Sequence, residues 1–268
     1  MSELLDLIRK STVYDLAQPY FAGMPHFPTH PPYLFGLTRK HGDMLLEGNV
    51  SSSAESIALG GHVGTHIDAL CHFSCNGKLY GGIQASSVQS STSGFSELGV
   101  DTVAPILRRG VLLDIAAEMD LDELPPDFSI TPHHLEKALK AAKTTVEPGD
   151  VVLLRTGWAR FFPTAARYVT GREGGHAVTG PGPELEAARW LSERGVFAAG
   201  SDTIAFEKVP VASMPVHVHL LVESGIHIIE ALNLEELARN RIHEFVFVAA
   251  PLNIRGGTGS PIRPVALA

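Results

Sequence analysis

Three histidines and one aspartate lie within an eleven-residue segment of the chain. The segment reads His62-Val63-Gly64-Thr65-His66-Ile67-Asp68-Ala69-Leu70-Cys71-His72. Neutral imidazole and ionised carboxylate are preferred ligands of zinc and also suit manganese or iron. Four such side chains in a largely apolar segment would be costly to bury without partners. The segment therefore predicts a metal site, and metal-dependent hydrolysis is the chemistry that it indicates.

The spacing within this segment constrains its local structure. His62 and His66 are four residues apart, as are Asp68 and His72. Each pair would share one face of a helix, whereas on a strand all four side chains would point the same way. The glycine and threonine between the first two histidines disfavour a regular helix there. We expect a strand or tight loop that runs into a helix around Ala69.

The segment resembles the His-x-Gly-Thr-His-x-Asp-x-x-x-His signature of the metal-dependent "putative cyclase" family. That family includes bacterial kynurenine formamidases, isatin hydrolases and related amide, lactam and lactone hydrolases. The similarity covers nearly the whole chain, in the same order and with about the same spacing. The matching segments are 14–16, 24–28, 110–114, 149–158, 195–196, 200–203, 215–217 and 225–230.

The resemblance implies a role for each residue of the signature. His62, His66 and Asp68 would bind a first metal ion, and His72 beside it would donate and accept protons. Three protein ligands leave a position open for water, and the metal lowers the pKa of that water toward neutrality. An unligated imidazole can then move protons near the working pH. His72 could instead be a further ligand, or a residue that holds a ligand in place.

Some formamidases of the family hold a second metal ion with a later histidine and a glutamate, for which His217 and Glu230 are the candidates. His219 lies two residues further on and would point the same way on a strand. His217 is favoured because it follows a Pro-Val pair, as in the family. Glu230 ends an apolar run, where a carboxylate needs a cation or strong donors. The cofactor is expected to be manganese or zinc, as one or two ions. His227, in the same run, is expected to be a satisfied core histidine.

Two phenylalanines are candidate walls of the substrate site. Phe27 lies in the stiff, proline-rich loop 24–33, at a place where many family members have tryptophan. Phenylalanine keeps the apolar wall but lacks the indole N–H donor, which weakens a kynurenine-specific assignment. Phe73 directly follows His72. Together with the Phe-Pro-Thr-His-Pro-Pro sequence, these residues favour the isatin hydrolase branch.

Composition limits the remaining possibilities. The 268 residues are 44% hydrophobic, enough for one domain over residues 1–268. The net charge of −8, with no basic run, argues against nucleic acid as a partner. No apolar stretch approaches a membrane span and no secretory signal is evident, so we expect a cytoplasmic protein. The two cysteines, Cys71 and Cys75, do not indicate a disulfide framework, and Cys71 is expected to be a small buried hydrophobe.

Short apolar runs next to Gly, Asp or Pro predict buried strands. These runs are 111–114, 151–155, 197–200 and 245–249. The Thr131-Pro132 pair predicts the start of a helix over 133–143, and further helices are expected over 183–194 and 234–239. An α/β fold follows. The resemblance implies the swivelling β/β/α cyclase-like type, with a mixed sheet and flanking helices. It also implies a homodimer or higher homo-oligomer, in which substrate loops sometimes come from the neighbouring subunit.

The leading hypothesis is an enzyme that hydrolyses C–N bonds other than peptide bonds. It would open a small cyclic amide such as isatin by attack of metal-bound hydroxide, with His72 protonating the leaving nitrogen. N-formylkynurenine is the alternative substrate, and a lactone comes third. The non-enzymatic alternative is an inactive metal- or ligand-binding protein. Because a degenerate member should have lost a ligand or the proton shuttle, the complete signature favours the enzyme.

Overall fold

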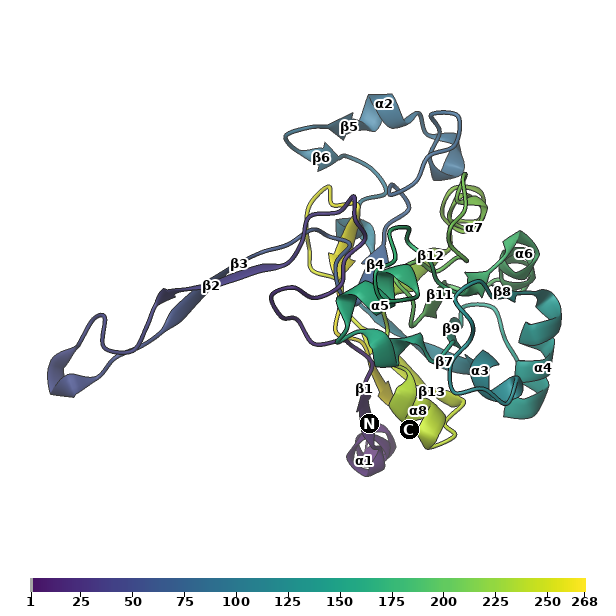
Figure 1. The fold of residues 1–268 in the computed structure, drawn as a ribbon, viewed down its shortest axis with the longest axis horizontal. Helices are drawn as coiled ribbons and strands as arrows, with labels where there is room; N and C mark the ends of the chain where they lie inside the picture. Colours follow the sequence, from purple (N-terminus) through teal and green to yellow (C-terminus); the bar gives the residue numbers. More distant parts are fainter. Residues whose placement is uncertain (1) are drawn as a thin grey trace.

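A computed structural model describes residues 2–268, and for residues 2–4 and 7 the backbone only. A nine-stranded sheet, in the order β1-β15-β13-β7-β9-β11-β12-β4-β14, forms its centre (Figure 1). The four strands β7, β9, β11 and β12 are parallel, and the others join antiparallel, so the sheet is mixed. The strands are β1 Val13–Asp15, β4 His66–Asp68, β7 Ile106–Asp114, β9 Val151–Arg155, β11 Ala198–Ser201, β12 His227–Glu230, β13 Glu244–Ala249, β14 Gly259–Pro261 and β15 Val265–Leu267.

Both faces of the central strands are covered. On β7, Leu113 packs into one hydrophobic core and Leu112 into another, because successive strand residues point to opposite faces. The first core includes residues of the helical layer α3 Ile115–Glu118, α4 Pro132–Ala142, α6 Leu185–Glu193, α7 Pro215–His217 and η5 Val218–Ser224. The second includes Leu237 of α8 Glu235–Arg239. Burial on two faces explains why these strands are continuous apolar runs.

The predicted elements can be compared with those observed. The four predicted strands correspond to β7, β9, β11 and β13, and the three predicted helices correspond to α4, α6 and α8. Thr131 caps α4, where its side chain and that of His134 form a reciprocal capping box. The α/β class with a mixed sheet is confirmed. The helix expected around Ala69 is wrong, because the chain turns there and is held by a hydrogen bond from Ala69 N to Thr258 O.

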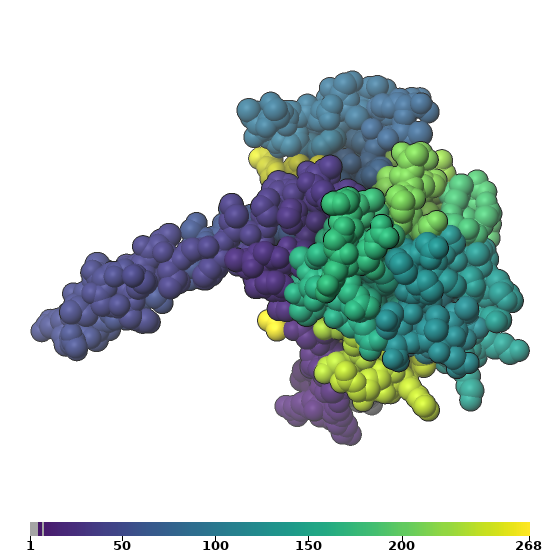
Figure 2. Space-filling model, in the orientation of Figure 1, coloured from purple at the N-terminus to yellow at the C-terminus, as the bar shows by residue number. Residues whose placement is uncertain are grey.

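A long hairpin extends from the body and is prominent in Figures 1 and 2. It consists of β2 Leu34–Arg39 and β3 Ala54–Ala58, which pair antiparallel, and of the tip between them. We call residues 34–58 the arm. The sequence did not predict it. The smaller elements are α1 Ser2–Lys10, η1 Glu47–Asn49, η2 Tyr80–Gly82, α2 Ala85–Val88, β5 Gln89–Ser90, β6 Gly94–Phe95, η3 Val100–Thr102, β8 Ser129–Ile130, η4 Trp158–Phe161, α5 Ala165–Thr170 and β10 Gly182–Pro183.

The helices of the described residues are short. None of those within 2–268 is long and apolar enough to cross a membrane.

Candidate metal centre

Strand β4 presents two candidate ligands on one face. His66 and Asp68 are two residues apart on the strand, so their side chains point the same way, while Ile67 between them enters the core. Gly64 just before the strand has φ +64°, and a Cβ there would lie 2.7 Å from Cζ of Tyr20. Glycine is therefore the residue that lets this loop deliver both His62 and His66 to the same place.

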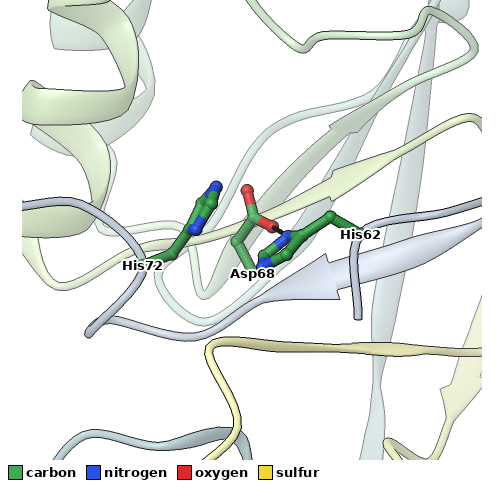
Figure 3. Close-up of side chains that lie close together, drawn as sticks. All are labelled: His62, Asp68 and His72. Carbon is green, nitrogen blue, oxygen red and sulfur yellow. Dashed lines mark hydrogen bonds and ion pairs between the residues drawn. The ribbon is translucent and has the colours of Figure 1, made fainter. Parts of the chain in front are cut away.

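His62, Asp68 and His72 meet in a tight group in which His62 and Asp68 are buried and His72 is partly exposed (Figure 3). His62 Nδ1 donates to Asp68 Oδ1 over 2.7 Å, and His62 Nε2 lies 2.9 Å from Oγ1 of Thr258. The His72 ring stacks on the His62 ring with centroids 3.8 Å apart. Gly259 makes room for this arrangement, because a Cβ there would lie 2.5 Å from Cε1 of His62. One ligand atom from each of the three residues lies within 4.8 Å of the other two.

A second group of three shares Asp68 with the first. His66, Asp68 and Glu230 each offer a buried ligand atom, again within 4.8 Å of one another. Glu230 is there because β12 pairs antiparallel with β4, with Glu230 opposite His66. The three residues expected to bind the first ion are thus divided between two groups. The His62 and His66 rings still lie edge to face with centroids 5.2 Å apart, and both ring nitrogens of His62 have hydrogen-bond partners.

Two atoms of the second group have no hydrogen-bond partner. His66 Nδ1 donates to the Gly64 carbonyl over 2.8 Å, so Nε2 is the ring nitrogen that faces Asp68 and Glu230, at 3.6 Å and 3.4 Å. That Nε2 and Oδ2 of Asp68 are buried and unpaired. Buried polar atoms are nearly always hydrogen-bonded, so each such orphan needs an explanation. A divalent cation accepts electron pairs from both an imidazole nitrogen and a carboxylate oxygen, and the donor set therefore fits zinc or manganese.

The structure places His217 at this site and His219 away from it. His217 Nε2 lies 3.1 Å from Glu230 Oε1, and its Nδ1 donates to Glu207 Oε1 over 2.6 Å. His219 instead contacts Ser192 and Glu223. The expectation for a strand is wrong here, because residues 215–224 are helical and side chains two apart on a helix point in different directions.

Residues 14–208 match the family model described as "Putative cyclase". The chain belongs to this family. A solved structure titled a novel cyclase is similar to this chain, with a TM-score of 0.87 and 28% sequence identity. The match covers 100% of this chain and 90% of that one. The structure of isatin hydrolase A from Ralstonia solanacearum has a TM-score of 0.75 at 25% identity, and the match covers 100% of this chain and 96% of that one.

Two curated relatives of this cyclase-family chain represent different named activities. The isatin hydrolase of Roseibium aggregatum is 31% identical over 218 residues, which are 79% of this chain and 73% of the relative. The kynurenine formamidase of Bordetella petrii is 24% identical over 260 residues, which are 94% and 96% of the two chains.

The two candidate substrate-wall residues, Phe73 and Phe27, lie at different distances from the candidate metal centre. The Phe73 ring lies 4.9 Å from the His72 ring and 4.8 Å from the His217 ring, so it packs between them. Phe27 lies next to His30, whose ring is 5.6 Å from the Phe27 ring and 5.1 Å from the His62 ring. The substrate-binding role of both phenylalanines stays a prediction.

Three residues at the site were missed by sequence reasoning, and one expectation for a neighbour is confirmed. Thr258 and Glu207 carry no local motif, and only the fold brings them to His62 and His217. His30 stands in a stiff proline-rich loop, and that setting was a signal that could have singled it out. His227 is a satisfied core histidine as expected, since its Nδ1 donates to the Asp68 carbonyl over 2.9 Å.

The charges of the ligand-free site are set by burial and by the neighbouring groups. Burial lowers the pKa of His72 to about 3, so its imidazole is neutral at pH 7. Burial would raise the pKa of Asp68, but the imidazoles of His72 and His62 outweigh it and hold that pKa well below its usual range. Burial opposes ionisation of His217 as well, yet hydrogen bonds to Glu207 and Glu230 raise its pKa to about 10. A metal ion that binds His217 must displace this proton.

Glu230 should make the metal-free protein less stable in acid. Burial would raise its pKa, but the hydrogen bond from His217 and the imidazole of His66, whose Nε2 lies 3.4 Å from Glu230 Oε2, lower it to about 2, from 4.5. A carboxyl with a depressed pKa stabilises the fold above its unfolded-state pKa, and this stabilisation is lost as the pH falls to about 2. Urea unfolding of chelated wild type and Glu230→Gln between pH 5 and 2 should show their difference shrinking by roughly 3 kcal/mol. If the free energies of unfolding of the two proteins changed in parallel with pH, the lowered pKa of Glu230 would be contradicted.

Glu207 should strengthen metal binding through His217. It accepts hydrogen bonds from both the Nδ1 and the backbone N of His217, which fix the ring and raise the basicity of Nε2. We expect Glu207→Gln to weaken metal binding by roughly 10- to 100-fold in a competition titration with a chromophoric chelator. Glu223→Gln is the matched control, because it alters the same kind of pair at His219, away from the site. Equal effects of the two substitutions would rule out a specific role for Glu207.

Proposed function

We propose that this cyclase-family protein is a metal-dependent hydrolase of amide C–N bonds, and that it opens a small cyclic amide of the isatin type. The observation that carries this proposal is the pair of buried, unpaired ligand atoms, His66 Nε2 and Asp68 Oδ2. They lie beside a carboxylate, Glu230, and Asp68 also groups with His62 and His72. A purely structural polar cluster would pair these atoms with one another.

The donor set would hold manganese or zinc in one or two positions. His62, His66 and Asp68 are the proposed ligands of a first ion, with His217 and Glu230 completing a second position. For His62 to serve, one of its ring nitrogens must give up its bond to Asp68 or Thr258. When bound, such an ion polarises the amide carbonyl as a Lewis acid and lowers the pKa of water.

His72 is the proposed proton carrier. It is neutral at pH 7, so it can accept a proton at a ring nitrogen and deliver it to the leaving amide nitrogen. Stacking on His62 and the edge contact with Phe73 hold its ring in one orientation.

The substrate class is proposed from the surroundings of the site and from the relatives. Phe73 presents an aromatic face between His72 and His217, which suits a flat, bicyclic aromatic lactam. The isatin hydrolase of Roseibium aggregatum is more similar in sequence, at 31% identity, than the kynurenine formamidase of Bordetella petrii, at 24%. Phe27 stands where a tryptophan would offer an N–H donor, and its ring offers none.

N-formylkynurenine is the second candidate substrate. The formamidase matches extend over 94% to 96% of this chain, against 79% for the isatin hydrolase, so their likeness includes segments outside the signature. A lactone is the third candidate, because the same residues would serve an ester carbonyl. A protein that binds metal without turnover is the alternative from another class.

Metal content and turnover measured on one sample test the proposal. Protein purified without added metal is analysed for bound zinc and manganese by mass spectrometry, then assayed with isatin, N-formylkynurenine and a lactone. The assays are repeated after chelation and after each metal is restored. We expect a bound ion, chelator-sensitive turnover, and a kcat/KM for isatin at least about tenfold above the others, or roughly 1.4 kcal/mol. Bound metal without turnover would support the alternative of a metal-binding protein. If the protein shows neither bound metal nor turnover, the proposal is overturned.

A further inference from the structure

Two of the segments that match the family, 149–158 and 200–203, lie outside the candidate ligand set but meet at the edge of the sheet that carries a ligand. β9, β11 and β12 are parallel neighbours, so their carboxyl ends lie at the same edge (Figure 1). Glu230 is the last residue of β12, and Asp202 directly follows β11. Ligand sites in α/β sheets form outside the carboxyl ends of strands. These segments are therefore placed where they can act on the metal centre.

Asp202 is a carboxylate with no exposed surface, and such a group is costly to keep in a protein core. Its Oδ1 accepts hydrogen bonds from Thr156 N over 2.9 Å and from Thr156 Oγ1 over 2.6 Å, and its Oδ2 accepts one from Gly157 N over 2.9 Å. Gly157 has φ +81°, and a Cβ there would lie 2.1 Å from Asp122 O, so only glycine fits. Burial raises the pKa of Asp202 to about 6 against these donors, which leaves it largely ionised at pH 7. The carbonyl of Asp202 also accepts a hydrogen bond from Tyr168 Oη over 3.0 Å, so backbone and side chain are both fixed.

Asp202 begins a loop, residues 202–207, which we call the clasp. All six of its residues are buried, although connecting loops usually run over the surface of a protein. Near its start, Thr203 O accepts a hydrogen bond from Ala231 N over 2.9 Å. Ala231 directly follows Glu230 in the chain. The clasp therefore packs along the strand end that carries this ligand.

The other end of the clasp holds two candidate ligands. Phe206 N donates to Glu230 Oε1 over 2.7 Å. Glu207 Oε1 accepts hydrogen bonds from both N and Nδ1 of His217. Because Phe206 occupies Oε1, the other carboxylate oxygen of Glu230 is the one that faces His66 Nε2, at 3.4 Å. The clasp thus selects the oxygen that Glu230 presents to a cation.

We propose that Asp202 is a positioning residue of the metal centre, because it anchors the clasp and the clasp orients Glu230 and His217. The inference rests on the proposed function, in which these two residues complete a metal position. Asp202 itself touches neither substrate nor ion. It acts through the backbone of Phe206 and the side chain of Glu207, so one anchor serves both ligands. If the anchor is lost, the Glu230 carboxylate is free to rotate and the His217 ring loses its fixed partner.

Hydrogen exchange of backbone amides tests the anchor in chelated protein, without any metal. Asp202→Asn removes the charge and leaves one oxygen for three donors. The amides of Phe206 and His217 should then exchange at least about tenfold faster than in wild type. Asp150→Asn is the matched control, because Asp150 is a buried aspartate at the opposite end of β9, where it accepts a hydrogen bond from Glu147 N. If the two variants affect these amides equally, the proposal is overturned.

Cobalt(II) provides the metal readout, since its visible absorption spectrum depends on the ligands and their geometry. Asp202→Asn should change the spectrum of the bound ion and weaken cobalt binding by roughly 10- to 100-fold, as measured by titration. Asp150→Asn should do neither, although it also removes a buried charge. Circular dichroism verifies that both variants fold. A folded Asp202→Asn variant with the spectrum and affinity of wild type overturns the proposal.

Thr156 supplies a second test that does not require Asp202 to be replaced. Thr156→Val removes the hydroxyl that donates to Asp202 and should change exchange, spectrum and affinity in the same direction. Thr156→Ser keeps the hydroxyl and should stay within about twofold of wild type. Equal behaviour of these two variants contradicts the role of the anchor. Failure of wild type to bind cobalt, zinc or manganese would overturn the proposed function and the role of Asp202 in it, while hydrogen exchange would still decide whether Asp202 anchors the clasp.

Discussion

Substitution of Asp68 by asparagine should abolish metal retention and lower kcat/KM by at least about 10³-fold, or roughly 4 kcal/mol. Asp68 belongs to both groups of candidate ligands, and its Oδ2 is one of the two unpaired atoms. Asparagine keeps the shape of the side chain but removes the negative charge and replaces one carboxylate oxygen with an NH₂ group that cannot ligate a cation. Metal analysis after dialysis and the isatin assay measure the two effects.

Asp127→Asn provides the control for this substitution. Asp127 is an exposed aspartate, so loss of its charge should leave metal content and turnover within about twofold of wild type. If Asp68→Asn retained metal at the wild-type level, the proposed ligand set would be wrong. Thermal unfolding of both variants distinguishes a lost ligand from a lost fold.

His72→Ala should lower kcat by about 10²- to 10⁴-fold while metal content stays near that of wild type. The expected split arises because His72 is proposed to move protons, whereas binding of the ion depends on the other residues. Burial lowers the pKa of the ligand-free imidazole to about 3, so the ring is neutral at pH 7. Pre-steady-state turnover and metal analysis of the same preparation measure both quantities.

His219→Ala is the matched control for His72, because His219 bonds to Ser192 and Glu223 and lies outside the site. Its turnover should be close to that of wild type. Loss of metal together with activity in His72→Ala would make His72 a ligand, as its grouping with His62 and Asp68 allows. Unchanged turnover would remove it from the mechanism.

The sequence predicts those parts of the fold whose causes are local. β9 is a run of buried apolar residues, and α4 begins at a threonine followed by proline, so pattern and capping suffice. The turn after Asp68 could not be predicted, because Ala69 and Cys71 hydrogen-bond to Thr258 and Leu98, which are distant in sequence. An apolar segment next to ligands is as compatible with a helix as with this turn.

In the candidate site too, some residues can be predicted from local sequence, whereas others depend on contacts between distant parts of the chain. The signature residues 62–72 could be found because their types and spacing are local. Glu207 could not, since its role depends on where α7 places His217. The arm was missed for a different reason. Its strands β2 and β3 are mostly exposed and lack the continuous apolar run from which the buried strands were predicted.

The position of β4 in the sheet has a consequence for when the site can form during synthesis. β4 lies between β12 and β14, which come from residues 227–230 and 259–261, and Thr258 bonds to His62. The ribosome makes the signature residues early, but about 190 further residues must emerge before their neighbouring strands exist. In the nascent chain, the histidines can therefore bind different cations, because the ligand geometry that would discriminate between metals has not yet formed. Under the proposed function, loading of the metal ion therefore follows translation, and the metals available to the finished fold decide which ion it binds.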